Sequence, residues 1–75
     1  MNSLERKDAE EMLYQVLSRT LINESDIKIL MDIAKMEDRP LPMKGILYEY
    51  TQMEKKELTK EDRDILDTLI YFYGP

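Results

Sequence analysis

The chain contains no cysteine, no histidine and no tryptophan among its 75 residues. Without cysteine there is no disulfide bridge and no thiolate metal site, and without histidine only carboxylate oxygens remain as strong side-chain ligands. No stretch has the ligand spacing of an EF-hand calcium loop. The sequence therefore predicts no bound metal and no cofactor, and its lack of cysteine suits a reducing cytoplasm.

Glycine, proline and long apolar runs are also scarce, with two glycines and three prolines in the whole chain. Two glycines are too few for a loop that cradles phosphate. The first residues, MNSLERKDAEE, are charged, and no apolar run resembles a signal peptide or is long enough to cross a bilayer. We expect one domain over residues 1–75, located in the cytoplasm and without membrane contact.

The residue types that perform most catalysis near neutral pH, histidine and cysteine, are missing. The serines are Ser3, Ser18 and Ser25, and none follows the pattern of a nucleophile elbow. Paired carboxylates such as Asp64 and Asp67 have spacings that are ordinary on a solvated helix. The sequence thus predicts a protein that is not an enzyme.

The charge is acidic but mixed: 16 acidic and 11 basic residues give a net charge of −5. The acidic excess is largest in residues 23–38 and 59–67. Direct binding to nucleic acid or to an anionic membrane requires clustered lysine and arginine, which the chain lacks. An acidic surface fits a basic protein partner, or serves only to keep a small domain soluble.

Apolar residues recur at helical spacing in four segments, so we expect an all-α fold with helices near residues 3–21, 24–37, 43–57 and 60–73. The last segment has the clearest start, because Thr59 and Asp62 can form a capping box. Its apolar face is wide enough to contact two neighbouring helices. Gly74 is expected to end it in a left-handed conformation.

Arg39-Pro40-Leu41-Pro42 is the one strong interruption, because each proline restricts the residue before it to extended conformations. Residues 22–34 and 58–70 also echo each other weakly at a spacing of 36. Two architectures are open: a compact bundle of four short helices, or two helical hairpins hinged at Arg39–Pro42.

The chain is rich in methionine and tyrosine, with six and five residues respectively. Tyr48 and Tyr71 lie off the apolar stripes of their helices, Met31 widens the stripe of the second helix, and Tyr14 lies at a stripe edge. Such residues are ordinarily core or rim residues, but Tyr and Met are also common at interfaces. We predict that Tyr14, Met31, Tyr48 and Tyr71 bind a protein partner.

Together these features predict a small acidic non-enzymatic regulator that binds another protein, as an inhibitor or adaptor, of transcription or DNA-handling machinery for example. Its partner would be a basic or nucleic-acid-binding protein. The alternatives are a self-associating structural module and a helix-turn-helix DNA-binding protein. We also expect a homodimer, because the second and fourth helices carry more apolar surface than a monomer covers. DNA mimicry is a minor alternative, with these carboxylates as phosphate mimics: Glu24, Asp26, Asp32, Asp38, Asp62, Asp64 and Asp67.

Overall fold

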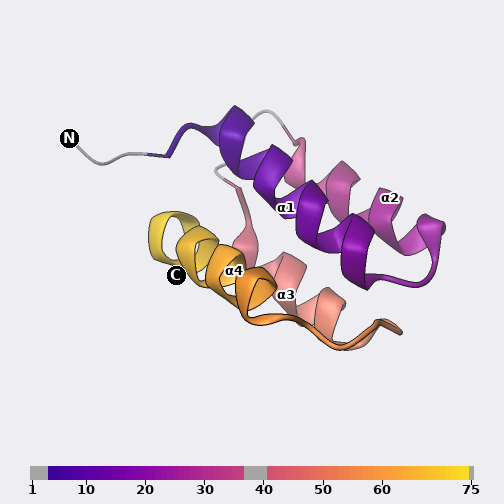
Figure 1. Ribbon diagram of the computed structural model, residues 1–75. Helices are drawn as coiled ribbons and strands as arrows, with labels where there is room; N and C mark the ends of the chain where they lie inside the picture. Colours follow the sequence, from indigo (N-terminus) through magenta and orange to yellow (C-terminus); the bar gives the residue numbers. More distant parts are fainter. Residues whose placement is uncertain (1–3, 37–40, 75) are drawn as a thin grey trace.

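The computed structural model describes residues 4–36 and 41–74, and the described chain folds into four α-helices (Figure 1). They are α1 (Arg6–Thr20), α2 (Glu24–Ala34), α3 (Met43–Thr51) and α4 (Lys60–Tyr73). The all-α prediction is confirmed. The expected start of the first helix, at residue 3, lies outside the described residues, and α1 begins at Arg6.

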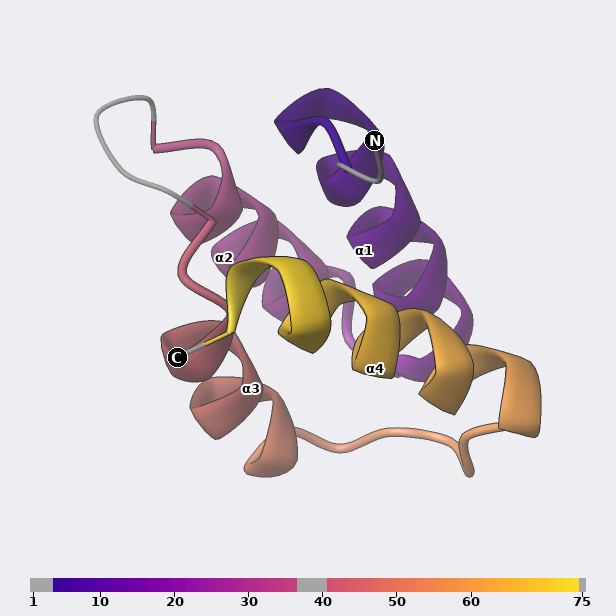
Figure 2. The same ribbon diagram turned by 90° about the vertical axis from the view of Figure 1, so that its left-hand side faces the viewer.

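The helices form a closed ring, in which α1 packs against α2 and α4, and α3 packs against the same two helices. In Figures 1 and 2 the α1–α2 pair forms one layer and the α3–α4 pair the other. Both expected hairpins are therefore present, and they are packed together as one bundle. The expected hinge falls partly on Arg39 and Pro40, which lie outside the described residues.

The core fills the space that the four helices enclose. α4 buries Leu66 and Leu69 and touches both α1 and α3, as its wide apolar face predicted. Leu41, in the link before α3, is also buried. The buried apolar residues are Ala9, Leu13, Val16, Leu17, Leu21, Leu30, Met31, Ala34, Leu41, Met43, Ile46, Tyr50, Leu66 and Leu69.

The capping box at the start of α4 is confirmed. The Asp62 N–H donates to Thr59 Oγ1 at 3.1 Å, and the Thr59 N–H donates to Asp62 Oδ2 at 3.2 Å. The expected left-handed glycine at the other end is wrong, because Gly74 has φ −73°. A Cβ at Gly74 would lie 2.4 Å from the Ile70 carbonyl oxygen. Close approach of the backbone, and not a positive φ, therefore favours glycine here.

The helix α3 ends at Thr51, six residues before the expected end at Glu57. The following link runs beside the α1–α2 turn. The Lys56 N–H donates to the Thr20 carbonyl at 2.7 Å, and an antiparallel bridge joins Leu21 to Lys55. The Lys55 ammonium also donates to the carbonyl of Tyr50, in the last turn of α3, at 3.0 Å. These contacts give hydrogen-bond partners to backbone N–H and C=O groups that would otherwise be paired within a longer helix.

The helix α2 differs from expectation in its end and in its inward face. It ends at Ala34, where the Arg6 guanidinium donates to the Ala34 carbonyl at 2.8 Å. The apolar spacing of the segment predicts that Ile29 and Met36 face inward with Leu30 and Ala34, but both are exposed. Because α2 packs between α1 and α3, its buried face is centred on Leu30 and Ala34.

Candidate protein-binding surfaces

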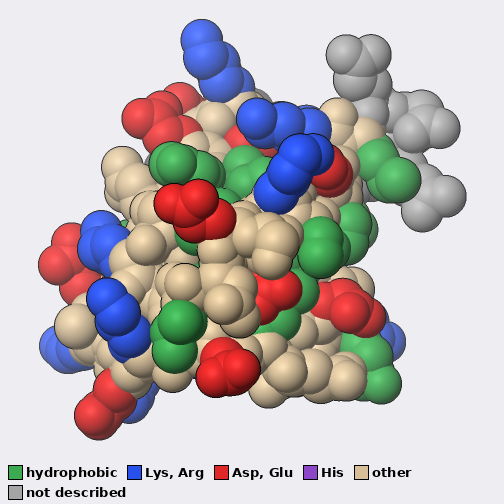
Figure 3. Space-filling model, turned by 90° about the vertical axis from the view of Figure 1, so that its right-hand side faces the viewer, with side chains coloured by type: hydrophobic (Ala, Val, Ile, Leu, Met, Phe, Trp, Pro, Cys, Tyr) green, Lys and Arg blue, Asp and Glu red, His purple; other side chains and the backbone are tan. Residues whose placement is uncertain are grey.

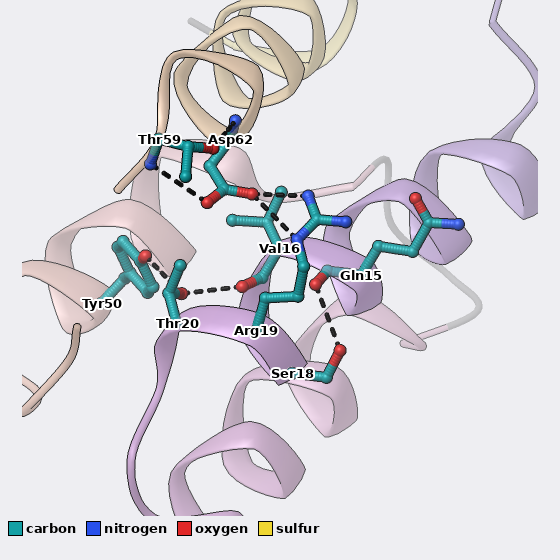
Figure 4. Close-up of polar contacts among 8 residues, drawn as sticks. All are labelled: Gln15, Val16, Ser18, Arg19, Thr20, Tyr50, Thr59 and Asp62. Carbon is teal, nitrogen blue, oxygen red and sulfur yellow. Dashed lines mark hydrogen bonds and ion pairs between the residues drawn. The ribbon is translucent and has the colours of Figure 1, made fainter. Parts of the chain in front are cut away.

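An ion pair fixes the end of α1 against the start of α4 (Figure 4). Arg19 Nη2 lies 2.5 Å and its Nε 3.1 Å from Asp62 Oδ1. The hydrogen bond from Arg19, helped by the Thr59 backbone, holds the pKa of Asp62 below its ordinary value although burial opposes this. Asp62 is 3% exposed, so its expected role as an exposed phosphate mimic is wrong.

A buried hydroxyl pair lies beside this ion pair and ties α3 to α1 (Figure 4). Thr20 Oγ1 lies 2.7 Å from both the Val16 carbonyl and the Tyr50 hydroxyl. Since threonine has one hydroxyl proton and the carbonyl must accept it, Tyr50 donates to Thr20. Burial raises the pKa of Tyr50. Both groups are thus held in structural hydrogen bonds, and every buried side-chain N or O atom in the described residues has a partner.

Tyr48 and Tyr71 project outward from α3 and α4. Their side chains are 66% and 83% exposed, which agrees with their place off the apolar stripes. The phase of α3 is set by Ile46 and Tyr50, which point into the core, so Tyr48 must point away. The Tyr71 and Phe72 rings are perpendicular to each other, with their centroids 5.0 Å apart.

Tyr14 and Met31 line a groove of about 620 Å³ between α1 and α2. Tyr14 is 51% exposed, as its place at the stripe edge suggested. Met31 is only 7% exposed, so it offers a partner little surface of its own, and its role in binding stays a prediction. The full lining is Tyr14, Ser18, Leu21, Ile22, Glu24, Ile27, Lys28, Met31 and Lys35.

Sequence reasoning missed the groove, although one local signal pointed to it. Asn23 is the N-cap residue of α2, and Ile22 and Ile27 occupy the positions directly before the cap and four residues after it. That spacing is typical of a hydrophobic staple, which fixes the angle at which the chain enters a helix. Both isoleucines line the groove, and Ile22 remains 56% exposed.

Acidic and basic side chains alternate over the face that Figure 3 shows, with apolar side chains in small patches between them. Among residues 4–36 and 41–74, no three acidic side chains are placed to hold a metal ion. Nor is any helix within those ranges both long enough and apolar enough to cross a membrane.

A comparison with models of known protein families finds no match, and comparisons with curated proteins and with solved structures find none either.

Proposed function

We propose that this chain is a small non-enzymatic regulator of the cytoplasm that acts by binding another protein through Tyr48 and Tyr71. The observation that carries the proposal is the exposure of these rings, 66% and 83%. Neither hydroxyl makes a hydrogen bond within the described chain. Tyrosine offers a large contact area at a low cost in conformational entropy, so outward tyrosines suit an interface.

The residues around Tyr71 favour a basic partner. Asp67 and Asp64 precede Tyr71 by four and seven residues, so they share its face of α4, and both are exposed. A partner that pairs lysine or arginine with these carboxylates can place an apolar pocket over the Tyr71 ring. Nucleic-acid-binding proteins have basic surfaces of this kind, and a protein that occupies such a surface acts as an inhibitor or adaptor.

The test is affinity capture from a lysate with the full chain and with the double variant Tyr48→Ala/Tyr71→Ala. Truncation of an aromatic interface residue often costs about 2 kcal/mol in binding, which is a factor of about 30. Because both side chains are exposed, the free energy of unfolding should change by no more than about 0.5 kcal/mol. We expect the variant to keep its helical circular dichroism and to lose the captured protein.

The matched control is Glu49→Ala/Arg63→Ala, which truncates exposed side chains on the same two helices, about 100° around α3 from Tyr48 and about 80° around α4 from Tyr71. This control should retain the partner, and added salt should weaken the parental complex, because carboxylates next to Tyr71 contribute to it. Equal capture by the double tyrosine variant and the parent would contradict the proposal. Retention of the parent on DNA would instead favour the helix-turn-helix alternative.

A further inference from the structure

The wall that α2 contributes to the groove has opposite charges at its two ends. Glu24 is the first residue of α2 and Lys35 follows its last residue, and both line the groove. Eleven residues span about three helical turns, so the two side chains leave the helix about 20° apart and about 16.5 Å apart along the axis. The groove wall is therefore acidic at one end and basic at the other.

Neither end charge is neutralised inside the described chain. The ion pairs formed there are Arg6–Glu10, Arg19–Asp62 and Lys28–Asp32, and they include neither Glu24 nor Lys35. Lys28, which also lines the groove, is held by Asp32 at 2.9 Å. Glu24 and Lys35 are both exposed and thus available to charges on another molecule.

The groove between these charges is lined by polar and apolar side chains, and its apolar part is only partly covered. Leu21 and Met31 form buried parts of its lining, and Ile27 is half-buried. Tyr14 and Ile22 keep 51% and 56% of their surface exposed. An occupant that covers these five residues removes apolar surface from water, which favours association.

We propose that the occupant of this groove is α2 of a second copy of this chain. In this dimer the two α2 helices are antiparallel, and the two-fold axis passes the helix between the positions of Ile29 and Leu30. Each residue of one α2 then faces the residue of the other α2 for which the two residue numbers add to 59. Glu24 then faces Lys35 of the second copy, and Lys35 faces Glu24 of the second copy. Each α2 then lies along α2 of the other copy and covers the open side of that copy's groove, opposite its Tyr14 and Ile22.

A second copy satisfies this surface better than an unrelated partner does. A patch with one acid and one base at opposite ends becomes its own complement after a two-fold rotation, and such a contact closes as a dimer. The dimer leaves Tyr48 and Tyr71 outside its interface, because they are on α3 and α4. Each dimer thus presents two copies of the partner-binding surface, so that a multivalent partner is held more tightly.

The test measures self-association by analytical ultracentrifugation of the full chain, of Glu24→Lys, of Lys35→Glu, and of the two changes combined. Each single reversal places like charges against each other at both symmetry-related contacts, and we expect at least a tenfold weaker dimer. The combined variant restores opposite charges and should dimerise within about threefold of the parent. Glu57→Lys, an exposed reversal in the α3–α4 link, is the matched control and should change nothing.

A second variant tests the apolar part of the interface. Ile22→Ser should weaken the dimer while the helical circular dichroism stays as in the parent, because Ile22 is already largely exposed. A parent that stays monomeric up to about millimolar concentration would overturn the proposal, and so would a combined variant that fails to recover. The single-reversal monomers should still bind the partner of Tyr48 and Tyr71, so the two proposals fail by separate measurements.

Discussion

At the scale of single residues, the two glycines of this chain have opposite roles. Gly45 lies in the first turn of α3, and a Cβ there would meet no atom within 4 Å. Gly45→Ala should therefore raise the free energy of unfolding by about 0.5–1 kcal/mol, since alanine favours the helix and restricts the unfolded chain. Urea denaturation followed by circular dichroism measures the change. Gly74→Ala is the counterpart and should lower stability, because its Cβ would approach the Ile70 carbonyl oxygen to 2.4 Å.

Asp62 gives the chain a pH-dependent contribution to stability. Its pKa is lowered in the folded protein, chiefly by the hydrogen bond from Arg19, so the ionised carboxylate stabilises the fold. That contribution is complete above the ordinary aspartate pKa and is lost as the pH falls through the lower folded-state value. Asp62→Asn should therefore cost about 1–2 kcal/mol at neutral pH. The difference from the parent should shrink below about pH 4.

Urea unfolding of both proteins across this pH range tests the role of Asp62. Asp64→Asn is the matched control, because Asp64 is on the same helix but is exposed and makes no ion pair within the described chain. The control should follow the parent at every pH. A constant difference between parent and Asp62→Asn down to the acid end would mean that the ionised carboxylate does not contribute.

At the scale of helices, α3 depends on its neighbours for stability. It has nine residues, whereas isolated helices shorter than about 12 residues are marginal in water. Leu41, next to its N-cap residue Pro42, is 1% exposed and anchors the start of α3 in the core. Leu41→Ala should cost about 2–4 kcal/mol, as measured by urea unfolding. Met36→Ala, which truncates an exposed side chain, should cost at most about 0.5 kcal/mol. Similar costs for both would show that Leu41 does not anchor α3.

The boundaries of the helices show which structural features are determined by residues close by in the sequence. Both ends of α4 agree with the sequence prediction, because nearby residues determine the Thr59–Asp62 capping box and the end of the helix at Gly74. The end of α3 does not agree, since residues after Thr51 pair with the α1–α2 turn some thirty residues earlier. The spacing of apolar residues within one segment does not predict a pairing between distant segments.

The candidate surfaces divide in the same way. The outward direction of Tyr48 and Tyr71 follows from helical phase, so the sequence predicted it. The burial of Met31 and the pairing of Arg19 with Asp62 depend on how α1 packs against α2 and α4, which helical phase alone does not specify. The groove was missed for the same reason, although Ile22 and Ile27 had the spacing of a staple.

At the scale of the whole molecule, the ring of helix contacts predicts that the two hairpins unfold as one cooperative unit. Val16 of α1 and Ile46 of α3 are both fully buried, one in each hairpin. Val16→Ala and Ile46→Val should each cost about 1–2 kcal/mol and leave the chain folded. If unfolding is two-state, each change lowers the stability of all four helices by the same amount.

Native-state amide hydrogen exchange distinguishes cooperative unfolding from hairpins that open separately. We expect Val16→Ala, in the α1–α2 hairpin, to reduce the protection of the slowest amides in α3 and α4 as much as in α1 and α2. Ile46→Val, in the α3–α4 hairpin, should likewise reduce protection in α1 and α2 as much as in α3 and α4. The physical reason is that α4 packs on α1 and α3 packs on α2, so that opening either hairpin exposes the core face of the other. Loss of protection confined to the hairpin that carries the substitution would instead show two units joined by a hinge.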